Sequence, residues 1–213
     1  MKTIKFLLVA CLLGMAATAS AQFANSGAAG GDSSDAEAWS GIRLSYNPVS
    51  IDVDGGDNFG LTGISATFVK SFSVTSSAPL FVETGLGISW IGGEFVEDSG
   101  LDVSVFSLNI PVNFGYKYVV NETTSIFPFI GITLRGNLFG SYSAGDESVN
   151  AFDDSEDEAG PLALNRFQIG WQIGVGANFN KFYVGASYGN DFSEILDDAC
   201  KASVPAITVG YNF

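Results

Sequence analysis

The sequence predicts an all-β protein: an eight-stranded antiparallel up-and-down transmembrane β-barrel. Three observations lead to this fold class. Eight segments alternate apolar and small or polar residues with a period of two, the connections between them alternate short and long, and the last strand ends on an aromatic residue. The 26 Gly and 18 Phe among 213 residues agree with it, because aromatic residues favour strands and Gly is well above its usual share.

The first 21 residues are predicted to be a secretory signal peptide. Met1–Lys5 is a short basic start, Phe6–Ala17 is apolar, and Ala19–Ala21 is a small-residue cleavage site. An N-terminal membrane anchor is the weaker interpretation, because 12 residues rise only about 18 Å as a helix. A lipoprotein box ending at Cys11 is also considered, but the apolar run before that cysteine is short.

Residues 22–38 are rich in Gly, Ser, Ala and Asp, and we expect them to be a flexible periplasmic leader to a barrel domain at 39–213. Removal of the signal peptide leaves 7 Lys and Arg against 23 Asp and Glu, a mature charge of −16. Cys200 would be the one remaining cysteine, so no intramolecular disulfide is expected. A reactive thiol and an unremarkable small residue are both open interpretations.

The period of two is clearest at Arg166–Asn178 and Ser104–Tyr118. In the first segment Phe167, Ile169 and Trp171 alternate with Gln168, Gly170 and Gln172. Pro111 falls inside the second segment and removes a ladder donor, which predicts a bulge or bend. The same alternation along the chain predicts eight strands: 39–48, 58–75, 79–92, 103–120, 124–142, 164–180, 182–191 and 203–213.

The connections alternate strictly in length. Those at 75–78, 121–123 and 178–181 are short, whereas those near 49–57, 93–102, 143–163 and 192–202 are longer and acidic. Every second connection of an up-and-down barrel lies on the same rim, so the pattern is typical of short periplasmic turns and long extracellular loops.

Which face is apolar separates a membrane barrel from a soluble barrel that holds its apolar residues inside. The polar face carries Arg43, Glu83, Lys117 and Arg135 among Gly, Ser and Asn, too few charges to coat a soluble exterior. The other face ends in aromatic residues, which predicts the aromatic girdles of a barrel with a lipid-facing exterior. They are Trp90, Tyr116, Tyr118, Tyr211 and Phe213.

An eight-stranded barrel has a lumen filled by side chains, so no open channel is expected. Because buried charges are costly when unpaired, we expect Arg43, Glu83, Lys117 and Arg135 to form an internal polar network. Glu83 would be its clear acid, and four amides would complete it: Asn109, Asn113, Gln168 and Gln172. The alternatives are a structural plug and a gated narrow path. Lys70 shares the parity of apolar neighbours, so its side of the wall is open.

Charge and composition restrict the function further. The chain has no His, so histidine-dependent triads and imidazole metal sites are excluded. The acidic balance argues against nucleic-acid binding. Of the 23 acids, 18 lie in the four long connections or their flanks. Carboxylates at Asp153, Asp154, Glu156, Asp157 and Glu158 could gather Ca²⁺ or Mg²⁺, although a solvated acidic rim explains them as well.

The final strand alternates outward Ile207, Val209, Tyr211 and Phe213 with small or polar residues, and its aromatic end resembles the insertion signal of Gram-negative outer-membrane barrels. Together with segments 107–118, 174–177 and 182–188, this strand resembles the small outer-membrane barrels of Bacteroidetes, the PorT-like group. The resemblance implies an outer-membrane location in a two-membrane bacterium and carries no catalytic residues.

The leading functional hypothesis is a non-enzymatic outer-membrane barrel, without a cofactor, that presents acidic extracellular loops or stabilises the envelope. A narrow porin or a transport or secretion accessory is the first alternative, and a divalent-cation-binding surface protein is the second. An envelope enzyme ranks lower, because the enzymatic barrels it would resemble rely on a histidine. The expected partners are outer-membrane lipids, lipopolysaccharide and the barrel-assembly machinery, and we expect a monomer.

Overall fold

The computed structural model describes residues 38–53, 59–75, 78–94, 100–152, 164–191 and 200–213. The predicted signal peptide, nearly all of the predicted leader, and Asp153–Glu158 lie outside these residues. The compact unit that contains the barrel spans Ala36–Phe213. Within the described residues there is no helix of the length and apolar character needed to cross a membrane.

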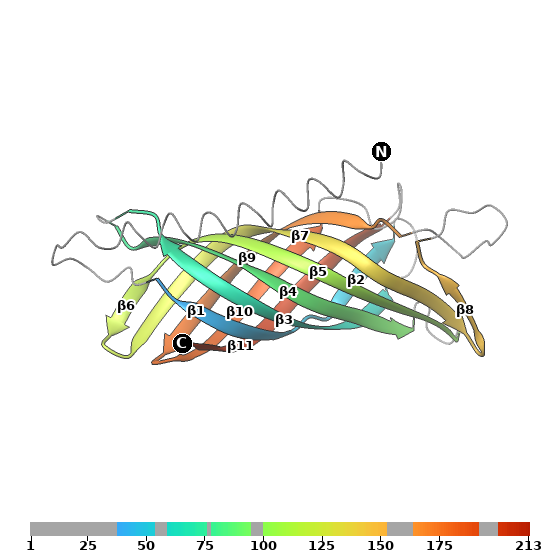
Figure 1. The fold of residues 1–213 in the computed structure, drawn as a ribbon, viewed down its shortest axis with the longest axis horizontal. Coiled ribbons are helices and arrows are strands. Elements are labelled where there is room, and N and C mark those ends of the chain that lie inside the picture. Colours follow the sequence, from blue (N-terminus) through green and yellow to red (C-terminus); the bar gives the residue numbers. More distant parts are fainter. Residues whose placement is uncertain (1–37, 54–58, 76–77, 95–99, 153–163, 192–199) are drawn as a thin grey trace. The chain divides into compact units, whose positions relative to one another are not determined.

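The described chain is built from antiparallel strands (Figure 1). They are β1 (Ser40–Tyr46), β2 (Val49–Val53), β3 (Phe59–Ser73), β4 (Leu80–Glu94), β5 (Leu101–Tyr116), β6 (Tyr118–Asn121), β7 (Thr124–Ala144), β8 (Glu147–Asn150), β9 (Phe167–Phe179), β10 (Phe182–Asp191) and β11 (Cys200–Asn212). β6 and β8 pair only with β7 and extend it as hairpins at its two ends. β1 and β2 together act as a single barrel strand, which makes eight.

The sheet closes on itself. β1 pairs with β11 on one side and with β3 on the other, and each remaining barrel strand pairs with its neighbours in chain order. The predicted eight-stranded up-and-down barrel is therefore confirmed. We call the rim with the connections β3–β4, β6–β7 and β9–β10 the short-turn end and the opposite rim the long-loop end. Asn180, at φ 54°, lies in the two-residue turn between β9 and β10, because Asn tolerates the left-handed region.

The closing seam has a gap in its hydrogen-bond ladder. Tyr46 pairs with Ile207 and Ser50 with Ser203, in one continuous register that sets Pro48 opposite Pro205. Phe213 N donates to Ser40 O at 2.9 Å, so these two residues form a hydrogen-bonded pair. Hydrogen-bonded pairs recur at every second position along an antiparallel register, and the Pro48–Pro205 pair falls at one of these positions. Both prolines lack the required donor. The predicted connection at 49–57 is thus partly strand, since β2 resumes after Pro48.

The register has a bulge on β7 and none at Pro111, where the sequence predicted a bulge or bend. The β4–β5 register is the same on both sides of Pro111, whereas the β5–β7 register shifts between Phe106 and Ser107. Leu138 is the extra residue, and both Leu138 and Phe139 face outward, with 44% and 71% of their surfaces exposed. β7 continues beyond the bulge with its parity exchanged, so Tyr142 points inward.

Apolar side chains cover the outside of the barrel, as the alternation predicted. Residues of one parity are exposed on each strand, among them Ile42 and Leu44 on β1 and Ile173 and Val175 on β9. The opposite parity is buried and polar in the middle of the barrel. Trp90, Tyr116, Tyr118, Tyr211 and Phe213 are all outward and exposed, consistent with the predicted aromatic girdles.

Candidate functional site: the closed lumen

The first ion pair in the lumen joins Arg43 of β1 and Glu83 of β4. The two side chains approach to 3.5 Å and both are buried. The Arg43 guanidinium also lies over the Tyr183 ring, 3.9 Å from its centroid. Trp39, directly before β1, donates from its indole N–H to the same carboxylate oxygen, Glu83 Oε2, at 3.0 Å. A carboxylate and an aromatic face thus compensate the buried cation together.

The second ion pair joins Arg135 of β7 and Asp191 at the end of β10, at 3.2 Å. Arg135 also donates to Gln168 Oε1 at 3.1 Å. The sequence counted Asp191 among the acids of a long connection and named Glu83 as the clear internal acid. The structure corrects that count, because the Asp191 side chain is buried inside the barrel.

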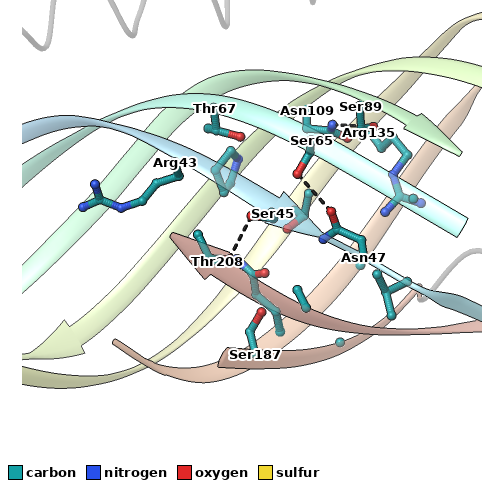
Figure 2. Close-up of a pocket in the computed structure, with 18 of the residues that line it drawn as sticks. Arg43, Ser45, Asn47, Ser65, Thr67, Ser89, Asn109, Arg135, Ser187 and Thr208 are labelled. Atoms are coloured by element: carbon teal, nitrogen blue, oxygen red, sulfur yellow. Dashed lines mark hydrogen bonds between the residues drawn. The ribbon is translucent and has the colours of Figure 1, made fainter. Parts of the chain in front are cut away.

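A cavity of about 160 Å³ lies in the lumen, and residues of both ion pairs line it (Figure 2). Nearly half of the lining residues carry a hydroxyl or an amide. They include Ser45, whose hydroxyl bonds Thr208 at 2.8 Å, and Asn47, which accepts from Ser65 at 3.1 Å. Asn109 Oδ1 and Arg135 Nε also belong to lining residues, are buried, and find no hydrogen-bond partner among the described residues. A polar cavity of this size meets the conditions for holding water.

The short-turn end of the lumen is filled by aromatic rings. Phe81, Phe127 and Tyr183 are buried there, with Trp39 packed against them. The Trp39 and Phe81 centroids are 5.0 Å apart, and Phe127 meets Phe81 edge to face at 5.7 Å. Gly176 on β9 makes room for this aromatic plug, because a Cβ there would collide with Phe127 and Tyr183.

The long-loop end is filled by a second apolar cluster. Its buried members come from four strands of the barrel and from the connection after β8: Val49, Leu61, Val103, Val105, Tyr142, Ala151 and Phe152. Gly140 admits the Phe152 ring, since a Cβ at Gly140 would lie 2.6 Å from Phe152 Cε2. The polar cavity therefore sits between two apolar layers, and the lumen is closed at both ends in the described part of the chain.

The four charged residues of the predicted internal network are placed in three different surroundings. Arg43 and Glu83 form one pair, and Arg135 pairs with Asp191 instead. Lys117 lies at the short-turn end with its ammonium 5.6 Å from the Trp39 ring. The four amides are engaged: Gln172 donates to Asn113 at 2.6 Å, Asn109 donates to Ser89 at 2.7 Å, and Gln168 accepts from Arg135.

The weak metal candidates Asp153, Asp154, Glu156, Asp157 and Glu158 lie outside the described residues. Within the described residues, no group of three or more His, Cys, Asp or Glu side chains is placed to hold a metal ion. Cys200 begins β11. Tyr211 on β11 and Phe213, directly after this strand, face outward, and their ring centroids are 6.1 Å apart.

The aromatic plug is the feature that the sequence reasoning missed. Phe81 shares the parity of Glu83, and Phe127 shares the parity of Arg135, so both could have been assigned to the lumen from the alternation alone. A second sequence signal for the aromatic plug is the run of glycines on the inward parity of β9. These glycines leave space for aromatic rings from neighbouring strands.

These features, a closed barrel with an apolar exterior and a charged interior, agree with the comparison with known protein families. The family model described as the outer membrane protein beta-barrel domain matches residues 7–213. The chain belongs to this family. Its members lie in the outer membrane, so the apolar exterior is the lipid-facing surface. No curated protein sequence matches the chain.

Solved structures that resemble the chain are also outer-membrane barrels. Neisserial surface protein A is 11% identical, with 83% of this chain and 99% of that chain covered and a TM-score of 0.51. Ail, the attachment invasion locus protein of Yersinia pestis, is 18% identical with the same coverage and a TM-score of 0.49. The outer membrane enzyme PagL is 12% identical, with 78% and 98% covered and a TM-score of 0.41.

Proposed function

We propose that this outer-membrane barrel is not an enzyme and that it presents its acidic long connections as an extracellular interaction surface or stabilises the envelope. The observation that carries the proposal is the closed lumen. Because apolar clusters fill both of its ends, the interior is not a passage, and contact with other molecules is left to the rims and the outer wall.

The charge distribution supports the long-loop end as the contact surface. Glu94, Asp102, Asp146 and Glu147 are exposed there, and most of the remaining acids lie in the long connections of the sequence. A single-sign rim raises the local concentration of cationic partners and repels anionic ones. The partner that suits this rim is therefore a basic protein surface or a cation-bearing molecule.

The interior chemistry supports a non-enzymatic role over an envelope enzyme. Glu83 and Asp191 are the carboxylates that the structure places in the lumen, and each is held by an arginine. Each of these carboxylates is occupied by its arginine partner and is not free to act on a substrate. The filled ends likewise disfavour the narrow porin and the transport or secretion accessory.

The finer assignments follow from the sequence. We propose membership of the PorT-like group of Bacteroidetes barrels on the strand motifs at 107–118 and 209–213, export through the signal peptide at 1–21, and a periplasmic leader at 22–38. Recognition of the β11 end, with Tyr211 and Phe213, by the barrel-assembly machinery would insert a monomeric barrel among outer-membrane lipids and lipopolysaccharide.

Digestion of intact cells with a glutamate-specific protease tests this orientation. We expect cuts after Glu147, Glu156 or Glu158 at the long-loop end, because that rim faces outward in the proposal. Glu122 is the matched internal control: it is exposed in the short turn between β6 and β7 and should be cut only after the outer membrane is opened. Cleavage at Glu122 in intact cells, with the 143–163 region protected, would invert the orientation.

A further inference from the structure

Lys70 lies on the lipid-facing side of the barrel wall. The β3–β4 register runs without a shift from Thr62 to Ser73, so no bulge turns the lysine inward, and it shares its face with outward Phe68. Phe72 and Val74 follow on the same face toward the short-turn end. Lys70 therefore sits within the apolar wall, close to its short-turn rim.

The side chain of Lys70 leans toward that rim. Its ammonium is 5.4 Å from the ring centroid of Phe72, the next outward residue toward the short turns. A lysine on the lipid face of a barrel is far more costly at the bilayer midplane than near an interface. The lean brings the charge to the level of the lipid headgroups. Neither ion pair among the described residues includes Lys70.

On the outer wall, the neighbours of Lys70 are small across the strands and aromatic along β3. Its two register partners, Ser40 on β1 and Thr84 on β4, carry small side chains. Phe68 and Phe72 stand on either side along β3, and the Phe213 ring stacks against Phe68 with centroids 6.5 Å apart. Thr84 donates its hydroxyl to Pro111 O at 2.9 Å, so the Ser40 hydroxyl is the donor beside the ammonium. We call Ser40, Phe68, Lys70, Phe72 and Thr84 the Lys70 notch.

We propose that the Lys70 notch binds the phosphate of an anionic phospholipid in the leaflet at the short-turn end. The ammonium and the Ser40 hydroxyl donate to the phosphate, and the acyl chains lie against Phe68 and Phe72. A lipid with a net negative charge is favoured over a zwitterionic one, because none of the five residues of the Lys70 notch carries a carboxylate that could receive a headgroup ammonium. The bound lipid would fix the depth of the barrel in the membrane.

The distribution of the other lysines supports this end as the one that meets anionic lipid. Lys117 and Lys181, the other lysines whose side chains the structure describes, both lie at the short-turn end. Their ammonium groups are 5.6 Å from the Trp39 ring and 5.9 Å from the Tyr211 ring. The chain has a large excess of acids. The lysines at the short-turn rim therefore attract a negative membrane surface, whereas the acidic long-loop rim repels it.

Native mass spectrometry of the purified full barrel, titrated with phosphatidylglycerol or with phosphatidylcholine of the same acyl chains, tests the proposal. The wild type should bind phosphatidylglycerol roughly fivefold more tightly, the effect expected for one lysine at a membrane surface. Lys70→Gln should abolish the preference and Lys70→Arg should keep it. Lys181→Gln, which removes a lysine at the same rim, should leave most of it.

Equal binding of the two lipids by the wild type would overturn the proposal, as would an unchanged preference in Lys70→Gln. Inorganic phosphate provides the third arm, since a lipid site depends on acyl contacts as well as charge. Phosphate should not displace phosphatidylglycerol; complete displacement would identify an anion site and contradict the assignment to lipid. The two substitutions at Lys70 lie on the exposed wall, so neither removes a contact of the lumen.

Discussion

Replacing Glu83 by Gln is expected to lower the free energy of unfolding by about 3–5 kcal/mol, the usual cost of leaving one member of a buried ion pair without its partner. Arg43 would keep its place over the Tyr183 ring but would lose its carboxylate partner in a buried site. Trp39 would exchange a charged acceptor for a neutral amide. Urea unfolding of the barrel in lipid bilayers, followed by tryptophan fluorescence, measures the change.

Two further variants make the Glu83 result specific to the pair. Glu122→Gln removes an exposed carboxylate in a short turn and should leave the stability unchanged within about 0.5 kcal/mol. The double replacement Arg43→Met with Glu83→Met removes both charges and should recover most of the loss. A Glu83→Gln barrel as stable as the wild type would show that this ion pair does not hold the lumen together.

Replacing Phe127 by Ala is expected to cost about 3–5 kcal/mol, the range for deleting a large buried aromatic side chain. Phe127 is 1% exposed and its ring contacts Phe81, Trp39 and Tyr183. The glycine at position 176 leaves no side chain that could move into the vacated volume. The same urea unfolding experiment in bilayers measures the loss.

Phe127→Leu is the matched control for this prediction, because it keeps most of the volume and should cost less than about 1.5 kcal/mol. If the alanine variant lost no more stability than the leucine variant, the plug would be loosely packed, and the short-turn end would not be closed as the contacts indicate.

The strands and the lipid-facing side followed from the sequence because alternation is a local property. Ile173 and Gln172 lie on opposite faces of β9 whatever the partner strands are. The lumen contacts depend instead on which strands face each other across the barrel, and on how far they are staggered. No pattern along the chain indicates that Arg135 meets Asp191. Asp191, the last residue of the predicted strand 182–191, was therefore counted with the acids of the connection that it flanks.

The aromatic plug and the bulge show two other limits. Phe81 and Phe127 share the parity of the polar, inward residues. The alternation alone does not show that their rings fill the lumen, because the glycines that make room for them lie on another strand. The bulge at Leu138 arises where β7 passes Phe106 and Ser107, whereas Pro111, the visible breaker, keeps its register. A proline in the sequence shows where a backbone donor is missing. It does not show where a strand carries an extra residue.

Planar-bilayer recording of the purified barrel tests the central claim, that the lumen is closed, most directly. The filled ends predict that the reconstituted protein gives no steady conductance step, while a general porin recorded under the same conditions gives its open steps. Insertion is verified in parallel by protease protection of the reconstituted barrel. A large, steady conductance from the inserted wild-type protein would contradict a lumen closed by the Trp39–Phe127 plug and the Tyr142–Phe152 cluster.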